Sequence, residues 1–332
     1  MRALEIFQLT GPKTALRVAE RPEPGPDDTV TGEPGVVVDV HAAGVAFPEV
    51  LQSYGRYQLQ PELPFVPGGE VAGIVRSAPP GSDLEPGDRV AAFCGLGGFA
   101  ETAVAPAHLT FRLPGALDDA QGAGLIMNYH TAWFALALRG RLRPSETVLV
   151  HGAAGGVGTA AVQVAKGLGA TAIAVVSSAA KADVARAAGA DHVVRADGPW
   201  KDQVRELTGD GVDVVCDPVG GDRFTDSLRA LREGGRLVVV GFTGGAIPEV
   251  RVNRLLLNNL EVIGAGWGAY VLSKPDVNRR AGAALEAMVT AGHVAPVVGA
   301  RVAFDDVVRG LELIEGRGAT GKVVLDVRPP AR

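Results

Sequence analysis

A turn containing three regularly spaced glycines carries the clearest chemical signal in the chain. Gly152, Gly155 and Gly158 lie at intervals of three between the apolar run TVLVH and an alanine-rich stretch. Small residues there allow a tight turn and let backbone N–H groups approach a pyrophosphate at the start of the following helix. The spelling departs from G-x-G-x-x-G, because Ala153 and Ala154 fill the middle. The pattern predicts a dinucleotide site; the alternative is a turn that only packs the helix against the strand.

The segment about 20 residues after the first glycine indicates which dinucleotide would bind. Sites for NAD usually carry Asp or Glu there, to hold the ribose 2′-hydroxyl. Residues 174–181 read AVVSSAAK and contain no acidic residue. Ser177, Ser178 and Lys181 instead offer hydroxyls and an ammonium, which suit a 2′-phosphate. We therefore expect NADPH, the alternative for Lys181 being a solvated lysine at a helix start.

The elements that must position these groups alternate between strand and helix. Apolar, β-branched runs are separated by helical patterns, and this predicts a parallel, doubly wound sheet. The predicted strands cover residues 147–151, 171–177, 192–194, 212–218, 236–241 and 260–265. The predicted helices between the first five of these strands cover residues 159–168 and 181–188, a stretch from Trp200, and 221–231.

The chain before residue 118 has a different character. Short alternating runs at 36–45, 70–75, 88–94 and 100–106 are separated by turn-forming segments, which predicts a β-rich unit. The last part of the chain contains a helical pattern around 281–291 and the strand-like GKVVLDV. These segments could return to the first unit or extend the second, and the sequence leaves both open.

Composition excludes several classes of protein. With 332 residues the chain is long enough for two domains, and 47% apolar with 21% charged residues excludes wholesale disorder. A net charge of −5 is unfavourable for general binding to nucleic acid or to anionic membranes. The two cysteines, Cys94 and Cys216, exclude a disulfide scaffold and a cysteine-rich zinc site, and we expect both to be buried apolar residues.

Neither targeting nor membrane insertion is expected from the apolar segments. The opening 14 residues lack the apolar stretch of a signal peptide. Residues 120–138 are uncharged and long enough to span a bilayer, but their glycines, Asn128 and His130 favour buried protein structure. We therefore expect a cytoplasmic protein. We also expect His41, His130 and His151 to be structural, because their positions lack the spacing of a metal-ligand set.

Motifs along nearly the whole chain resemble those of one family, the zinc-independent quinone oxidoreductases of the medium-chain dehydrogenase/reductase superfamily. The resemblance rests on HAAGVAFPEVLQSYGRYQ, PFVPGGEVAGIV, GDRV, NYHTAW, HGAAGGVGTAAVQVAK, SSAAK, AAGADHVV, DVVCDPVGG, GGRLVVVGFTGG, IGAGWGAY and GKVVLDV. It implies an α/β protein with a GroES-like, β-rich catalytic domain and a doubly wound Rossmann NADPH-binding domain. The implied boundaries are 1–118 and 265–332 for the first, and 119–264 for the second.

This chain departs from related proteins at the positions of their zinc ligands and at positions that line the substrate pocket. Zinc-dependent relatives carry cysteine where this chain has Ala46 and histidine where it has Gly69, and the four-cysteine loop after Cys94 is missing. We therefore expect no metal. Many quinone reductases carry Asn at the position of Ala46, and some carry Tyr at that of Leu51, so we expect a more apolar pocket. Tyr57 matches the polar residues of that pocket and is the candidate catalytic residue.

The resemblance also implies a set of cofactor contacts, with the nicotinamide lying in the cleft between the domains. Two of these contacts have a structural alternative: Trp267 as core, and Lys322 as a surface or C-terminal residue. For Tyr57, the candidate catalytic residue, the alternative is a packing aromatic. The implied contacts are Asn128, Tyr129, Thr131, Gly155, Gly156, Val157, Ser177, Lys181, Val219, Gly241, Phe242, Gly266, Trp267, Gly268 and Lys322.

The predicted activity is an NADPH-dependent, zinc-free reduction of quinones or similar activated carbonyl compounds. One alternative is reduction of an enone or enoyl thioester on the same scaffold, with Tyr57 or water supplying the proton. Another is an NADPH-binding structural or regulatory protein with little turnover. The resemblance further implies a homodimer, with the run LEVIGA as the edge strand that pairs across the two-fold axis. The expected partner is a small molecule, and neither nucleic acid nor a membrane is expected.

Overall fold

A computed structural model describes residues 1–328 and divides the chain into two compact units. Of the described residues, the first unit contains 1–127, 274–282 and 296–328, and the second contains 128–273 and 283–295. Each unit is built around its own sheet.

The second unit contains a six-stranded parallel sheet with strand order β10-β9-β8-β11-β12-β13. The chain starts at the centre, moves outward to one edge, returns to the centre and then moves to the other edge, as in doubly wound folds. The strands are β8 (Thr147–His151), β9 (Thr171–Val176), β10 (His192–Arg195), β11 (Val212–Asp217), β12 (Leu231–Val239) and β13 (Glu261–Gly264). The predicted doubly wound sheet is confirmed.

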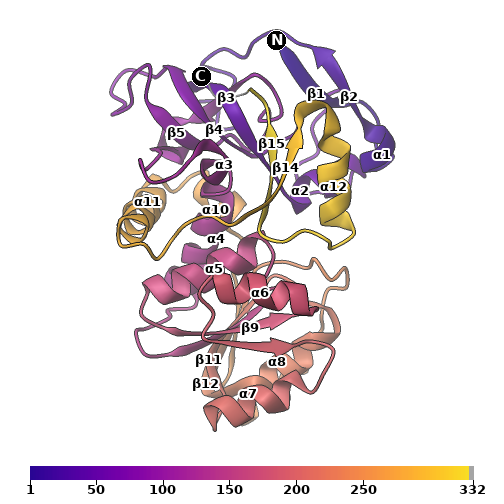
Figure 1. Ribbon diagram of the computed structural model, residues 1–332, viewed down its shortest axis with the longest axis vertical. Helices are drawn as coiled ribbons and strands as arrows, with labels where there is room; N and C mark the ends of the chain where they lie inside the picture. Colours follow the sequence, from indigo (N-terminus) through magenta and orange to yellow (C-terminus); the bar gives the residue numbers. More distant parts are fainter. Residues whose placement is uncertain (329–332) are drawn as a thin grey trace. The chain divides into compact units, whose positions relative to one another are not determined.

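Helices cover both faces of this sheet (Figure 1). Helix α5 (Gly156–Gly167) and helix α6 (Ala179–Ala187) pack on one face, against β8, β9 and β10. Helix α7 (Trp200–Thr208) and helix α8 (Phe224–Ala230) cover the other face. Side chains of α7 and α8 join a buried cluster with the alternate strand residues Leu149, Ile173, Val175 and Val215. This burial on both faces explains why the strands read as nearly continuous apolar runs.

The first unit contains a sheet of seven strands in the order β14-β15-β3-β4-β5-β7, with β6 also pairing with β3. A separate two-stranded ribbon is formed by β1 (Arg2–Ile6) and β2 (Leu16–Glu20). The strands of the larger sheet are β3 (Gly35–Val45), β4 (Glu70–Ser77), β5 (Arg89–Phe93), β6 (Thr102–Pro106), β7 (Thr110–Arg112), β14 (Val298–Ala303) and β15 (Lys322–Asp326). Strand β15 lies between β14 and β3, so the end of the chain returns to the first unit.

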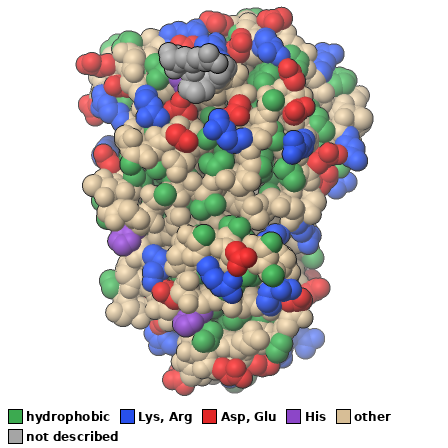
Figure 2. Space-filling model, in the orientation of Figure 1, with side chains coloured by type: hydrophobic (Ala, Val, Ile, Leu, Met, Phe, Trp, Pro, Cys, Tyr) green, Lys and Arg blue, Asp and Glu red, His purple; other side chains and the backbone are tan. Residues whose placement is uncertain are grey.

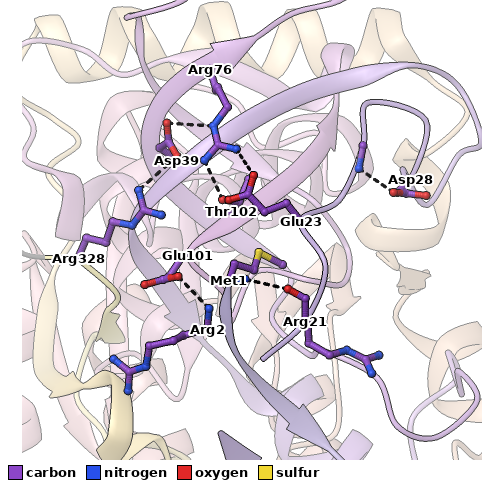
Figure 3. Close-up of polar contacts among 11 residues, drawn as sticks. Met1, Arg2, Arg21, Glu23, Asp28, Asp39, Arg76, Glu101, Thr102 and Arg328 are labelled. Carbon is purple, nitrogen blue, oxygen red and sulfur yellow. Dashed lines mark hydrogen bonds and ion pairs between the residues drawn. The ribbon is translucent and has the colours of Figure 1, made fainter. Parts of the chain in front are cut away.

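Ion pairs at the surface of the first unit link its strands (Figure 3). The guanidinium of Arg76 on β4 contacts Asp39 of β3 at 2.5 Å, Glu23 at 2.6 Å and the hydroxyl of Thr102 on β6 at 3.1 Å. Arg328 lies 3.3 Å from Asp39 on the other side. Hydrogen bonding to Arg76 lowers the pKa of Asp39. Because Arg76 and Asp39 are partly exposed, we attribute strand alignment, not a large gain in stability, to this network.

The compact units divide the chain at positions that differ from the domain boundaries predicted at 118/119 and 264/265. Helix α3 (Asp119–Gly122) joins the first unit, because Ala120 and Ala123 pack with Ala42, Ala72 and Val324 of its sheet. Residues 265–273 join the second unit, where the ring of Tyr270 lies 5.1 Å from that of Phe134. Residues 283–295, within and just after helix α11 (Pro275–Thr290), also group with the second unit. The domain assignment itself stays a prediction.

Surface and core composition agree with several expectations. Both cysteines are buried and free, as predicted. Among residues 1–328 no helix is both long and apolar enough to cross a bilayer; the uncharged segment 120–138 is divided between α3 and π-helical turns at Ile126–His130 and Phe134–Arg139. Acidic and basic side chains are interspersed over the face drawn in Figure 2. The cytoplasmic location stays a prediction.

Candidate functional site

The glycine turn leads directly from β8 into the N-terminus of α5. Gly152 has a φ of 58°, a left-handed conformation that favours glycine, and its carbonyl accepts a 2.9 Å hydrogen bond from the Gly155 N–H. Gly155 is the N-cap of α5, and no side chain caps this helix. The first N–H groups of a helix have no partner within the helix, so an anion can accept them here.

Tight packing at Gly158 explains why a glycine is needed within the first turn of α5. A Cβ atom at this position would lie 2.1 Å from the carbonyl oxygen of Gly152 and 2.7 Å from Cα of Ala153. Both are backbone atoms and cannot move aside cheaply. A Cβ on Gly156 would lie 2.6 Å from the side-chain nitrogen of Asn128. The turn, its uncapped helix and this close approach fit the pyrophosphate of a dinucleotide.

The end of β9 lacks a carboxylate and begins a second helix. The hydroxyl of Ser178 caps α6 by accepting a 3.2 Å hydrogen bond from the Lys181 N–H. Ser177 is exposed, and Lys181 is partly buried in the first turn of α6. The two serines therefore differ: Ser178 caps the helix, whereas Ser177 is exposed to solvent. A 2′-phosphate fits this edge better than a bare ribose would.

Further predicted contacts of the second unit follow the carboxyl ends of β11, β12 and β13. Val219 follows β11, Gly241 and Phe242 follow β12, and residues 266–268 follow β13. Val219 reaches the glycine turn, since a Cβ on Gly152 would lie 3.1 Å from its Cγ2. The carboxyl ends of parallel strands are where ligands of doubly wound folds bind. The structure thus brings together residues separated by more than 100 positions in the chain.

Asp217 holds the backbone that follows β11, and its role was not identified from the sequence. It is 2% exposed at the end of β11, and its Oδ1 accepts hydrogen bonds from the N–H groups of Val219, at 2.8 Å, and Gly220, at 2.9 Å. Its backbone carbonyl accepts a further bond from the Val240 N–H at 2.9 Å. The signal was present in VDVVCDP, where an acidic residue ends a buried strand.

Several predicted contacts of the second unit have buried side chains. The Tyr129 hydroxyl donates a 2.8 Å hydrogen bond to Gln163 of α5, and Gln163 in turn bonds both backbone groups of Ala295 at 3.0 Å. Trp267 is 4% exposed, with its ring 6.0 Å from that of His130. Asn128 and Thr131 are also buried. For Tyr129 and Trp267 the structure provides packing roles; direct contact of these residues with a cofactor stays a prediction.

In the first unit, Tyr57 lies on the loop after α2 (Phe47–Ser53). Its side chain is partly buried. Burial and the nearby Glu49 carboxylate raise the pKa of the Tyr57 hydroxyl above its ordinary value. The hydroxyl is therefore protonated at neutral pH and can donate a hydrogen bond or a proton.

Glu49, on α2, occupies the region where zinc-dependent relatives would hold a metal. One oxygen of its carboxylate accepts a 2.8 Å hydrogen bond from the Ala46 N–H, and the other accepts a 3.2 Å bond from the Gly69 N–H. The side chain is 2% exposed, and burial raises the pKa of this carboxyl to about 7, although Lys322 opposes the shift. Sequence reasoning missed Glu49; the available signal was an acidic residue at the third position of a helix whose second residue is proline.

Lys322, predicted to contact the cofactor, forms a buried ion pair with Glu70. The ammonium and the carboxylate are 3% and 0% exposed, and Glu70 also accepts a 2.8 Å hydrogen bond from the Met127 N–H. The pair joins β15 to β4 across 252 positions of the chain. Contact of Lys322 with a cofactor stays a prediction, and its pairing with Glu70 was not foreseen.

A zinc ion does not fit the residues of this region. Ala46 and Gly69 have no ligand atoms, and a side chain at 69 would meet Met127, whose Cε lies 2.7 Å from an ideal Cβ. The ammonium of Lys322 occupies the neighbourhood of Glu70 and would repel a cation. Across residues 1–328, no group of three or more His, Cys, Asp and Glu residues could hold a metal ion. His41 and His151 are instead engaged with Asp119 and Ser227, each at 2.8 Å.

Comparison with known proteins agrees with this architecture. Two family models match the chain: an alcohol dehydrogenase GroES-like domain at residues 32–115 and a zinc-binding dehydrogenase at residues 156–285. The chain is 32% identical to the quinone oxidoreductase of Homo sapiens over 330 residues, covering 98% of this chain and 97% of that protein. A protein with these two domains is an oxidoreductase of the medium-chain dehydrogenase/reductase superfamily.

Two solved structures are also similar over nearly the whole chain. A probable oxidoreductase from Mycobacterium abscessus has 45% identity and a TM-score of 0.87, with 98% of each chain covered. The Escherichia coli quinone oxidoreductase, solved in complex with NADPH, has 29% identity and a TM-score of 0.86, with 98% and 100% covered. The chain belongs to the quinone oxidoreductase family, and the expected fold of a GroES-like and a Rossmann domain is confirmed.

Proposed function

We propose that the protein is an NADPH-dependent, zinc-free reductase of quinones. In the overall reaction, NADPH, a quinone and one proton give NADP⁺ and the hydroquinone. The observation that carries the proposal is the uncapped N-terminus of α5 behind a glycine turn, beside a second strand end without a carboxylate. The names of the relatives, and the NADPH bound to the E. coli enzyme, support the cofactor and the acceptor class.

Each part of the proposed site has a separate task. When bound, NADPH supplies a hydride from its nicotinamide ring. The N–H groups at the start of α5 hold the pyrophosphate, and Ser177 with Lys181 holds the 2′-phosphate. Tyr57 has a hydroxyl that stays protonated at neutral pH, so it, or water, supplies the proton that completes the hydroquinone.

The zinc-free part of the proposal rests on charge and on donor groups. A quinone accepts hydride readily, because the negative charge spreads into an aromatic ring, so no Lewis acid is required. The carboxylate of Glu49 is engaged by two backbone N–H groups, and Glu70 is engaged by Lys322. These contacts leave neither carboxylate available as one of the three protein ligands that catalytic zinc requires.

Steady-state assays with metal analysis test the proposal. Purified protein should oxidise NADPH when 1,4-benzoquinone is added, and prior dialysis against a chelator should leave the rate unchanged. Elemental analysis should find far less than one zinc per chain. Loss of activity with the chelator, restored by zinc, would refute the metal-free reaction.

Reduction of an enone or enoyl thioester is the second candidate function. Ala46 and Leu51 favour it, because both make the predicted substrate pocket more apolar than in quinone reductases. A panel of quinones, enones and acyl-CoA thioesters distinguishes the two, and a preference of about a hundredfold in kcat/KM would decide it. Tight binding of NADPH without turnover on the whole panel would instead favour a structural or regulatory role.

Replacement of Lys181 tests the choice of nucleotide. Lys181→Ala should weaken NADPH about ten- to a hundredfold, the value of a charge-assisted contact with phosphate, and should change NADH little. Dissociation constants from fluorescence titration give the comparison. Equal losses for both nucleotides would mean that Lys181 does not recognise the phosphate.

We also propose a homodimer formed through the edge of the second unit. Strand β13 ends the strand order of its sheet, and the exposed apolar residues Val252, Leu256 and Leu257 precede it in the chain. Sedimentation at micromolar concentration should give twice the chain mass, and Leu256→Glu with Leu257→Glu should favour the monomer. Leu207→Glu, at an exposed leucine of α7, is the control. A monomeric wild-type protein would contradict the proposal.

A further inference from the structure

The end of β10 carries a second cation beside the end of β9. Arg195 is the last residue of β10 and pairs in register with Val176, the last residue of β9. The N–H of Ala196 donates a 2.8 Å hydrogen bond to the carbonyl of Val176, which fixes the end of β10 against β9. Ser177 follows Val176 directly, so Arg195 and Ser177 belong to the same corner of the sheet.

Strand alternation shows which face of the sheet carries the Arg195 side chain. Val194 and its register partner Val175 belong to the core cluster that includes Trp200 and Val204 of α7. Neighbouring residues of a strand point to opposite faces, so Arg195 and Val176 face the side covered by α6. Lys181 lies in the first turn of that helix. Both cations therefore lie on one side of the sheet, at the carboxyl end of its strands.

The guanidinium of Arg195 has hydrogen-bonding capacity that its present partner does not use. One terminal nitrogen donates a 2.7 Å hydrogen bond to Asp197. The Nε–H is buried and has no hydrogen-bond partner within residues 1–328. A guanidinium carries five N–H donors, and a phosphate accepts two of them in parallel. The Arg195 side chain as a whole is 43% exposed, so an anion can reach its terminal nitrogens, though not the buried Nε, from solvent.

Charges near Arg195 include both signs. Asp197 is 63% exposed and pairs with Arg195, and Asp183 on α6 pairs with Arg186 at 2.8 Å. Each of these two carboxylates is thus matched by an arginine. An additional doubly charged anion is compatible with this balance, whereas a carboxylate at the end of β9 would have opposed it.

We propose that Arg195 is a specificity-determining residue that binds the 2′-phosphate of NADPH together with Lys181. The inference rests on the proposed function, because it takes the 2′-phosphate to lie beyond the end of β9. It adds a bidentate donor from the neighbouring strand, which the sequence reasoning did not identify. Recognition by two strands would make discrimination against NADH stronger than a single lysine could achieve.

Binding of nucleotide fragments tests this role without any quinone chemistry. Adenosine 2′,5′-bisphosphate and 5′-AMP differ only in the 2′-phosphate, so the ratio of their dissociation constants, measured by calorimetry, reports its recognition. Arg195→Met should reduce that ratio about ten- to a hundredfold by weakening the bisphosphate alone. Arg195→Lys keeps the charge but loses the bidentate geometry, and should give an intermediate ratio. Arg229→Met is the matched control, because Arg229 pairs with Asp226 on α8 at the other face of the sheet, and it should leave the ratio unchanged.

The outcomes separate this inference from the proposed function. A ratio that stays unchanged in Arg195→Met but falls in Lys181→Ala would overturn the role of Arg195 and leave the 2′-phosphate site in place. A ratio unchanged in both variants would overturn the proposed position of the phosphate as well. If Arg195→Met fails to fold, judged by its thermal unfolding, the ratio in Arg195→Lys decides: a wild-type value overturns the inference, and an intermediate value supports it.

Discussion

The ion pair between Lys322 and Glu70 is deeply buried in the first unit, with 3% and 0% of the two side chains exposed. Removing one partner of a buried pair leaves the other charge without compensation, which typically costs about 3–5 kcal/mol. Lys322→Met should therefore lower the free energy of unfolding by about this amount. Chemical denaturation monitored by circular dichroism measures the change.

A double variant provides the control for this prediction. Glu70→Gln with Lys322→Met removes both charges and keeps an oxygen that can accept the Met127 N–H bond. It should be more stable than Lys322→Met alone, because no unpaired charge remains. If the loss of unfolding free energy in the double variant equals the sum of the losses in the two single variants, the two side chains are not coupled as the structure indicates.

The predictability of individual site residues depended on whether their signal was local. The glycine turn and Lys181 could be identified because a strand, a turn and a helix follow one another within about 35 positions. Glu49, by contrast, acquires its role from N–H groups at positions 46 and 69, and Lys322 acquires its role from Glu70. No local pattern brings such residues together, so only the folded chain reveals them.

At the scale of elements, α5 can pack against β8 only while position 158 lacks a side chain. Gly158→Ala should displace the glycine turn, lower stability by about 1–3 kcal/mol as overpacking does, and weaken NADPH at least tenfold. Thermal unfolding and nucleotide titration measure the two effects. Gly198→Ala is the control, since the nearest atom to its Cβ would be 3.7 Å away. Wild-type NADPH affinity in Gly158→Ala would contradict the packing argument.

Most strands of both sheets were predictable within a few residues, whereas the helical turns after α3 were not. Runs such as 147–151 and 212–218 are apolar, β-branched and bounded by glycine or proline, so local preference and burial agree. Residues 126–139 instead form π-helical turns around a short α-helical piece. The wider turn of a π-helix has no simple periodic sequence pattern, because it depends on what the segment packs against.

At the scale of the whole molecule, buried imidazoles make stability depend on pH. Burial lowers the pKa of His151 from 6.5 to about 4 and that of His130 from 6.5 to about 3. Between pH 6.5 and the lowered pKa of each histidine, the unfolded chain binds a proton that the folded chain does not. The free energy of unfolding therefore falls as pH drops below about 6.5. Each imidazole changes the free energy of unfolding by roughly 1.4 kcal/mol per pH unit between its folded-state pKa and its ordinary pKa.

Glu49 opposes this dependence over part of the same range. Its carboxyl has a pKa of about 7 in the folded protein and 4.5 ordinarily, so between these values the folded chain binds the extra proton and stability falls as pH rises. Glu49→Gln removes this opposition and should make the rise in unfolding free energy from pH 4.5 to 6.5 steeper than in the wild type. Urea titrations at several pH values measure both slopes, and a shallower slope in the variant would contradict the assignment.

The arrangement of β14 and β15 was not predictable from sequence. The pattern of GKVVLDV indicated a strand, but not that it would lie antiparallel to β3, with Val324 opposite Gly44. Two strands that are so far apart in the chain pair only in the complete sheet, so a local pattern does not predict which strand will be the neighbour. The parallel sheet was predictable by contrast, because its strands follow one another with helices between them and obey the handedness of such crossovers.

The position of β15 between β14 and β3 has a consequence for synthesis on the ribosome. All six strands of the second unit lie between residues 147 and 264, so that unit can fold while translation is still in progress. In the larger sheet of the first unit, most of which is translated earlier, β6 pairs with the first half of β3, but residues 42–45 of β3 lack their β15 partner until residues 322–326 leave the exit tunnel. The half of the protein that is made first is therefore completed last, and during that interval it is the half most in need of a chaperone.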